Sequence, residues 1–176
     1  MVHSKFRTAT TDPNAAANSS QAQININYLD GLGRGEQGIG YKQSPLQKDL
    51  VQRTQIYDTY GRVIRQTLPS VAPTDNGSFQ GNAQSLANTF YGDNNAFTET
   101  TLFDNSPLNR TREQYGAGQA WRTGNKKTQV FYESAGNTVR RYVVDASGNI
   151  NLSGTYPKGV LLKTQVVDEQ GHTTVD

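Results

Sequence analysis

The segment Asn27-Tyr28-Leu29-Asp30-Gly31-Leu32-Gly33-Arg34 contains a short motif, Asp-x-x-Gly after an apolar or aromatic run, that returns along the chain. An aspartate at the first position of a turn can accept backbone N–H bonds, and a glycine at the fourth tolerates a positive φ. A type I turn followed by such a glycine makes a bulged hairpin. We therefore predict a series of antiparallel hairpins. Their turns begin at Asp30, Asp58, Asp145 and Asp168, with a looser copy at Glu133, and their glycines are Gly33, Gly61, Gly148, Gly171 and Gly136.

Polar and apolar residues alternate beside these turns, as they do in β-strands. Ile24, Ile26 and Tyr28 alternate with polar residues before the first turn, and the same period of two returns after Arg62. Thr, Asn, Gln and Ser make up about a third of the chain, and they favour strands, turns and caps over long helices. The sequence therefore predicts a mostly β fold, an antiparallel sheet of twisted hairpins.

The period of two does not extend over the whole chain. Residues 1–21 show no period and few large apolar groups, which is typical of a flexible tail or linker. Residues 22–176 are expected to form a single β-rich domain that continues into further repeats in the full-length protein.

One segment is predicted to be helical. Leu86 and Phe90 lie four residues apart within residues 82–91, and Asn82 is a candidate cap for the helix. The remaining irregular segments are expected to be loops, at about residues 69–81, 104–109 and 115–126.

Charge and cysteine content exclude several classes of function. The formal net charge is only +2, whereas nucleic-acid binding would call for a clustered basic face, so nucleic-acid binding is not expected. The absence of cysteine excludes disulfides, thiolate catalysis and zinc–cysteine sites. No apolar run approaches the ~20 residues of a membrane span. The first residues also lack the apolar stretch of a signal peptide, so the chain is either cytosolic or an internal piece of a longer exported chain.

An ordered set of motifs resembles a known family. The most specific members are Phe103-Asp104-Asn105-Ser106-Pro107-Leu108-Asn109-Arg110 and Ala120-Trp121. Over residues 24–176 the chain resembles the DUF6443 domain, which precedes the RHS or YD repeats of large proteins of Bacteroidetes-type bacteria. Gly35-Glu36 departs from the pattern, since a proline and an alternating strand are expected there. The other motifs are Asn27 to Arg34, Ser44-Pro45, Lys48-Asp49-Leu50-Val51, Tyr57-Asp58, Leu68-Pro69, Glu113-Gln114-Tyr115-Gly116, Tyr156-Pro157-Lys158-Gly159 and Lys163-Thr164.

The resemblance implies an architectural role. RHS and YD-repeat proteins form long β-ribbons that wind into a hollow shell, often around a C-terminal toxin, and they are secreted or displayed at the cell surface. The chain is then expected to be a non-catalytic structural and interaction module, the N-terminal part of such a shell in a polymorphic-toxin-type protein. Its expected partners are downstream repeats of the same protein or neighbouring shell strands. No catalytic residue, cofactor or metal is implied, so we expect no enzyme.

The repeat residues themselves are assigned structural roles. We expect the turn acids to cap turns rather than to form the carboxylate pair of a glycosidase. Arg34 and Arg62 follow the turn glycines. They are expected to pair with a neighbouring repeat's acid or to stack on Tyr28 or Tyr57.

The alternative function is a carbohydrate-binding module of a surface adhesin. Trp121, Tyr115 and Tyr91 are its candidate aromatic platform, although a single tryptophan in a small β domain more often packs in a core or seam. The segment Asp93-Asn94-Asn95 with Glu99 resembles part of a calcium loop, but its spacing matches no defined loop and favours a solvated turn.

Overall fold

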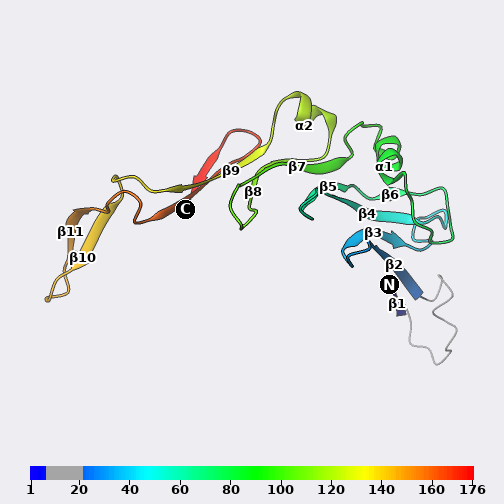
Figure 1. Ribbon diagram of the computed structural model, residues 1–176, viewed down its shortest axis with the longest axis horizontal. Coiled ribbons are helices and arrows are strands. Elements are labelled where there is room, and N and C mark those ends of the chain that lie inside the picture. The colour runs from blue at the N-terminus through cyan, green and yellow to red at the C-terminus, as the bar shows by residue number, and fades with distance from the viewer. Residues whose placement is uncertain (7–21) are drawn as a thin grey trace. The chain divides into compact units, whose positions relative to one another are not determined.

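The computed structural model describes residues 1–6 and 22–176 of the 176-residue chain. We expected a single domain over residues 22–176, and the chain instead divides into two compact units. The first comprises Met1–Thr101 and Gln114–Asn125, and the second comprises Leu102–Glu113 and Lys126–Asp176. Strands dominate both units and all the paired strands run antiparallel, which confirms the predicted fold class (Figure 1).

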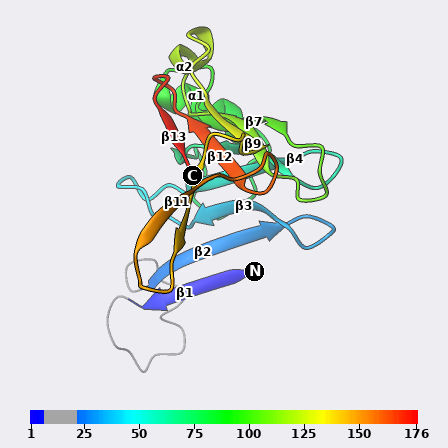
Figure 2. The ribbon, with the colours of Figure 1, turned by 90° about the vertical axis from the view of Figure 1, so that its left-hand side faces the viewer.

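Antiparallel neighbours that follow one another in sequence build the first unit. Their order is β1-β2-β3-β4-β5-β7, and β6 pairs with β4. Figure 2 shows β1, β2 and β3 side by side. The strands are β1 (Val2–Phe6), β2 (Ala22–Leu29), β3 (Gly35–Gly40), β4 (Leu50–Tyr57), β5 (Val63–Thr67), β6 (Ser70–Val71) and β7 (Phe97–Phe103), of which β7 runs past the unit's boundary.

The N-terminal tail predicted from sequence is wrong for its first residues. Val2–Phe6 form β1, which pairs with β2 in the register Val2↔Ile26 to Phe6↔Ala22. The segment forms a strand although it lacks an alternating pattern, because pairing with β2, rather than its own composition, stabilises it. The rest of the predicted tail, residues 7–21, lies outside the described residues.

The predicted helix is present as α1 (Ala83–Tyr91). Ala83 joins Ile39, Val51 and Ala72 in the buried core, and Leu86 packs against it, whereas Phe90 is 56% exposed. Asn82 is the N-cap residue, as predicted, but it caps α1 only through its backbone carbonyl, which accepts the N–H of Leu86, and its side chain makes no capping hydrogen bond.

Two of the predicted loops contain short elements. Strand β6 lies within residues 69–81, and α2 (Gln119–Thr123) lies within residues 115–126. Two-residue and five-residue elements are too short to show a period, so pattern analysis misses them.

A buried aspartate ties the loops of the first unit together. The side chain of Asp49 is fully buried. Its carboxylate accepts the backbone N–H groups of Lys42 (3.1 Å) and Gly77 (2.7 Å) and the hydroxyl of Thr74 (3.1 Å). Buried donors must be paired, so this one side chain ties the β3–β4 loop to the segment between β6 and α1.

The second unit is an antiparallel sheet with a separate two-stranded ribbon. The order in the sheet is β8-β9-β12-β13, and β10 pairs only with β11 among the described residues. The elements are β8 (Thr111–Tyr115), whose last residues belong to the first unit, β9 (Thr128–Ser134), β10 (Arg140–Val144), β11 (Ile150–Thr155), β12 (Leu162–Val167) and β13 (Thr173–Val175).

Replacing Asp49 with alanine should lower the free energy of unfolding by about 3 kcal/mol, because three donors lose their buried acceptor. Urea unfolding followed by Trp121 fluorescence measures the loss. The matched control is Asp75→Ala, which removes an exposed carboxylate 3.3 Å from Lys48 and should cost under about 1 kcal/mol. Equal losses in the two variants would contradict the clamping role of Asp49.

Candidate functional site

Four of the predicted turns share one geometry. In the first, Oδ1 of Asp30 accepts the backbone N–H groups of Leu32 and Arg34, each at 2.9 Å. The backbone N–H of Asp30 also donates to the Arg34 carbonyl, and the Asp30 carbonyl accepts the N–H of Gly33. We call this arrangement a carboxylate-clamped turn. The same bonds recur at Asp58, Asp145 and Asp168.

The fourth residue of each clamped turn is left-handed, as the sequence predicts. The φ values are 80° at Gly33, 80° at Gly61, 85° at Gly148 and 90° at Gly171. An L side chain is strained in this region, so glycine is favoured at each position.

Backbone hydrogen bonds keep the turn acids ionised. The N–H of Arg34 lowers the pKa of Asp30, and those of Asn149 and His172 do the same for the pKa values of Asp145 and Asp168. A carboxylate that is engaged as an acceptor in this way is a poor proton donor or nucleophile. The geometry therefore supports capping as the role of these acids.

The fifth predicted turn, at Glu133, does not exist. Glu133 lies within β9 opposite Lys163, with its carboxylate 3.3 Å from the Lys163 ammonium. Gly136 is not among the left-handed glycines. The glutamate side chain is one methylene longer than aspartate, so it does not close on its own backbone and pairs across the sheet instead.

A longer clamped turn, not predicted from the sequence, begins at Asp104. Its Oδ1 accepts the N–H of Arg110 (2.8 Å), and its own N–H donates to the Arg110 carbonyl (2.8 Å). Asn109 takes the place of glycine, with a φ of 48°. Two extra residues hide the motif from a search for Asp-x-x-Gly, and the usable signal is an aspartate closed by Asn-Arg after an aromatic residue.

The arginine that closes a turn also reaches the next hairpin. Nε of Arg34 lies 2.6 Å from Oδ2 of its own turn acid, Asp30, and its guanidinium carbon lies 4.2 Å from the ring centroid of Tyr57. The predicted stacking on Tyr57 is therefore present, whereas the predicted ion pair with a neighbouring acid is replaced by one within the turn. Arg62 likewise pairs with its own Asp58, at 2.7 Å.

The same contact recurs in the second unit. Arg110 pairs with Asp104 at 2.7 Å, and its guanidinium carbon lies 3.8 Å from the ring centroid of Tyr132 on β9. In both units an arginine therefore joins a turn acid to an aromatic ring on a neighbouring strand.

The carboxylate of Glu99, a candidate calcium ligand, is bound instead by two arginine side chains. Nε of Arg65 lies 2.5 Å from its carboxylate, and Arg122 binds the other oxygen. Both guanidinium groups also lie over the ring of Phe97, with centroid distances of 4.9 and 4.8 Å. Asp93, the other candidate calcium ligand, accepts the N–H groups of Asn95 and Gln119. No group of three His, Asp or Glu side chains suited to a metal occurs among the described residues.

The predicted aromatic platform is largely engaged in internal contacts. The Tyr91 hydroxyl donates to the Pro69 carbonyl, and the Tyr115 hydroxyl donates to Asn125. The guanidinium carbon of Arg122 lies 5.1 Å from the Tyr115 ring centroid. Trp121 on α2 is 38% exposed and Tyr91 is 46% exposed, so both rings remain partly accessible.

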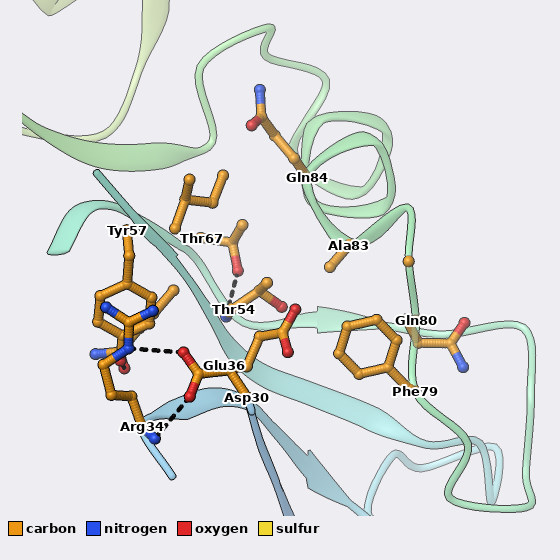
Figure 3. Close-up of a pocket in the computed structure, with 13 residues that line it drawn as sticks. Asp30, Arg34, Glu36, Thr54, Tyr57, Thr67, Phe79, Gln80, Ala83 and Gln84 are labelled. Carbon is orange, nitrogen blue, oxygen red and sulfur yellow. Dashed lines mark hydrogen bonds and ion pairs between the residues drawn. The ribbon is translucent and has the colours of Figure 1, made fainter. Parts of the chain in front are cut away.

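A cleft of about 500 Å³ opens beside the first clamped turn (Figure 3). The ion pair of Asp30 and Arg34 forms part of its lining, and Phe79, which is 40% exposed, supplies an aromatic surface. Its volume falls within the range of ligand pockets. The other lining residues are Glu36, Thr54, Gln55, Ile56, Tyr57, Thr67, Gln80, Gly81, Ala83 and Gln84.

The sequence of the chain matches one known protein family. Residues 2–134 match the family described as Domain of unknown function (DUF6443), and the chain belongs to that family. The match includes β1 and ends with β9. No curated protein matches the sequence. None of the helices in the described parts of the chain is long and apolar enough to cross a membrane.

The close approach of Arg34 to Gly61 gives a matched pair of glycine variants. A Cβ added at Gly61 would lie 2.7 Å from Nη1 of Arg34, whereas one at Gly33 would meet nothing within 4 Å. Gly33→Ala should therefore lower the free energy of unfolding by about 1–2 kcal/mol from backbone strain alone. Gly61→Ala should cost about 1 kcal/mol more, because it also displaces Arg34 from Tyr57.

Urea unfolding followed by Trp121 fluorescence measures both losses. Adding Arg34→Ala should remove the excess cost of Gly61→Ala but leave that of Gly33→Ala unchanged. Equal costs for the two glycine variants would show that Arg34 does not constrain Gly61.

Proposed function

We propose that the chain is a non-catalytic structural and interaction module, the N-terminal part of an RHS or YD-repeat shell in a secreted or surface protein of the polymorphic-toxin type. The observation that carries the proposal is the recurrence of one clamped turn at four places, with a longer variant at Asp104. A repeated hairpin with a fixed turn is the unit from which a long β-ribbon is built. Each clamp uses its carboxylate internally, which supports an architectural role over a catalytic one.

The β10–β11 ribbon supports the proposal, because one of its apolar faces is left exposed by the described parts of the chain. Tyr142 lies opposite Leu152 and Val144 lies opposite Ile150, so all four side chains point to one side. Their exposed fractions are 52%, 58%, 68% and 73% in the same order. A two-stranded ribbon is marginally stable in water unless its apolar face is covered. Neighbouring hairpins of the same shell would cover it.

The reading frame around these residues distinguishes this role from others. A long tract of Tyr-Asp repeats downstream, ending in a variable domain, supports the shell. A reading frame that lacks such repeats would rule it out.

The apolar face also predicts the behaviour of the chain in solution. The chain should bind an apolar dye and associate with itself as its concentration rises, because exposed apolar patches are sites of association. In the double variant Val144→Thr/Ile150→Thr, dye fluorescence should fall by about half, since two of the four apolar side chains are replaced while β-propensity is kept. Fluorescence titration and sedimentation velocity measure the two effects.

The matched control alters the opposite face of the same ribbon. Val143 and Asn151 lie opposite one another there, and Val143→Thr/Asn151→Thr should leave dye binding unchanged. A chain that binds no dye and stays monomeric would contradict a role for this face in assembly.

A carbohydrate-binding module of a surface adhesin is the second proposal, favoured by the accessible indole of Trp121. Sugars bind proteins by stacking their apolar faces on aromatic rings, so Trp121→Ala should abolish any binding to a glycan array. Tyr91→Phe is the control, because it removes a hydroxyl that is already bonded to Pro69. Binding that survives Trp121→Ala, or no binding to any glycan, would exclude this platform.

A further inference from the structure

Arginines in this chain are repeatedly held between a carboxylate and an aromatic ring. In the first unit Arg34 uses Asp30 and Tyr57. The geometry combines a charge-assisted hydrogen bond with contact between the guanidinium and the ring face. The other examples are Arg110 with Asp104 and Tyr132, Arg65 with Glu99 and Phe97, and Arg122 with Glu99, Phe97 and Tyr115.

The cleft contains a second carboxylate and aromatic ring, those of Glu36 and Phe79, with no arginine held between them. Glu36 extends into the cleft toward Phe79 (Figure 3). It is half-buried, and among the described residues it makes no hydrogen bond and no ion pair. The ring of Phe79 is fixed by an edge-on contact with Tyr28, with centroids 5.4 Å apart, and is still 40% exposed.

A β-bulge places Glu36 in this position. Tyr28 lies opposite Gln37 and Leu29 lies opposite Gly35, so Glu36 is the extra residue of β3. Bulges redirect the side chains that they carry. The equivalent extra residue after the Asp58 turn is Ile64. The turn therefore does not require a carboxylate at this position, and Glu36 needs another explanation.

The other polar groups of the cleft are largely engaged within the chain. The Thr67 hydroxyl accepts the N–H of Thr54, and the Tyr57 hydroxyl donates to the Gly35 carbonyl. The Gln80 amide donates to Thr74 and Ser78. With Asp30 neutralised by Arg34, the cleft keeps one uncompensated negative charge, on Glu36. This arrangement suits a cation better than a polyol, which needs many free hydrogen-bonding groups.

We propose that the cleft binds the guanidinium group of an arginine side chain presented by another polypeptide. The guanidinium would donate to the Glu36 carboxylate and lie against the Phe79 ring. It would thus make the same two contacts that Arg34 makes with Asp30 and Tyr57. The cleft volume of about 500 Å³ leaves room for flanking peptide atoms. This binding role does not depend on the shell role.

The test uses the whole chain and a single-residue probe, N-acetyl-arginine methylamide, titrated by NMR. The probe should bind with a dissociation constant on the order of 1 mM and shift the resonances of Glu36 and Phe79. Glu36→Gln should weaken binding at least about tenfold, because it removes the charge-assisted pair. Phe79→Leu should weaken it about fivefold by removing the ring face.

The control variant is Asp75→Asn, which changes the net charge equally at an exposed carboxylate outside the cleft lining and should leave affinity unchanged. Circular dichroism verifies that each variant is folded. The citrulline analogue, a neutral isostere of the probe, should not bind.

Three outcomes would overturn the proposal. One is equal binding of the citrulline analogue, and another is unchanged affinity in Glu36→Gln. The third is binding of methyl glycosides in the cleft with no binding of the arginine probe, which would make the cleft a carbohydrate site.

Discussion

The fold depends on an aspartate carboxylate that accepts the backbone N–H groups two and four residues further along the chain. At Asp30 and at Asp58 these bonds fix the length of the turn and the register of the strands on either side. Register decides which side chains face the core, because a slip of one residue would exchange the two faces of a strand. The clamp also leaves the second carboxylate oxygen free to hold the closing arginine, so Arg34 is aimed at the ring of Tyr57.

The variants of the turn show which parts of it are necessary. Asp104 closes on Arg110 across two additional residues and uses Asn109 in place of glycine. Glu133 keeps the spacing and the glycine but forms no turn. The short carboxylate side chain is therefore the strict requirement, whereas loop length and the left-handed residue can vary, since Asn also tolerates positive φ.

The sequence predicts the features that arise from local chemistry. Asp30, Asp58, Asp145 and Asp168 each bond to their own turn, so their roles and the hairpins can be read from four or five residues. Contacts between distant segments are invisible at that level. Asp49 meets Gly77 across 28 residues. Glu36 and Phe79 line one cleft only because a bulge in β3 turns Glu36 toward the segment that precedes α1.

The apolar side chains of a hairpin are buried or exposed according to which other elements cover them. In the first unit the apolar residues Ile39 and Val51 are covered by α1, whose Ala83 is small enough to allow close packing. In the ribbon of the second unit the equivalent apolar pairs remain exposed, and the chain between β11 and β12 forms neither a helix nor a strand. Burial of apolar area is the main source of stability for such elements. In the proposed shell, a neighbouring hairpin would bury these side chains and so supply the stability that the isolated ribbon lacks.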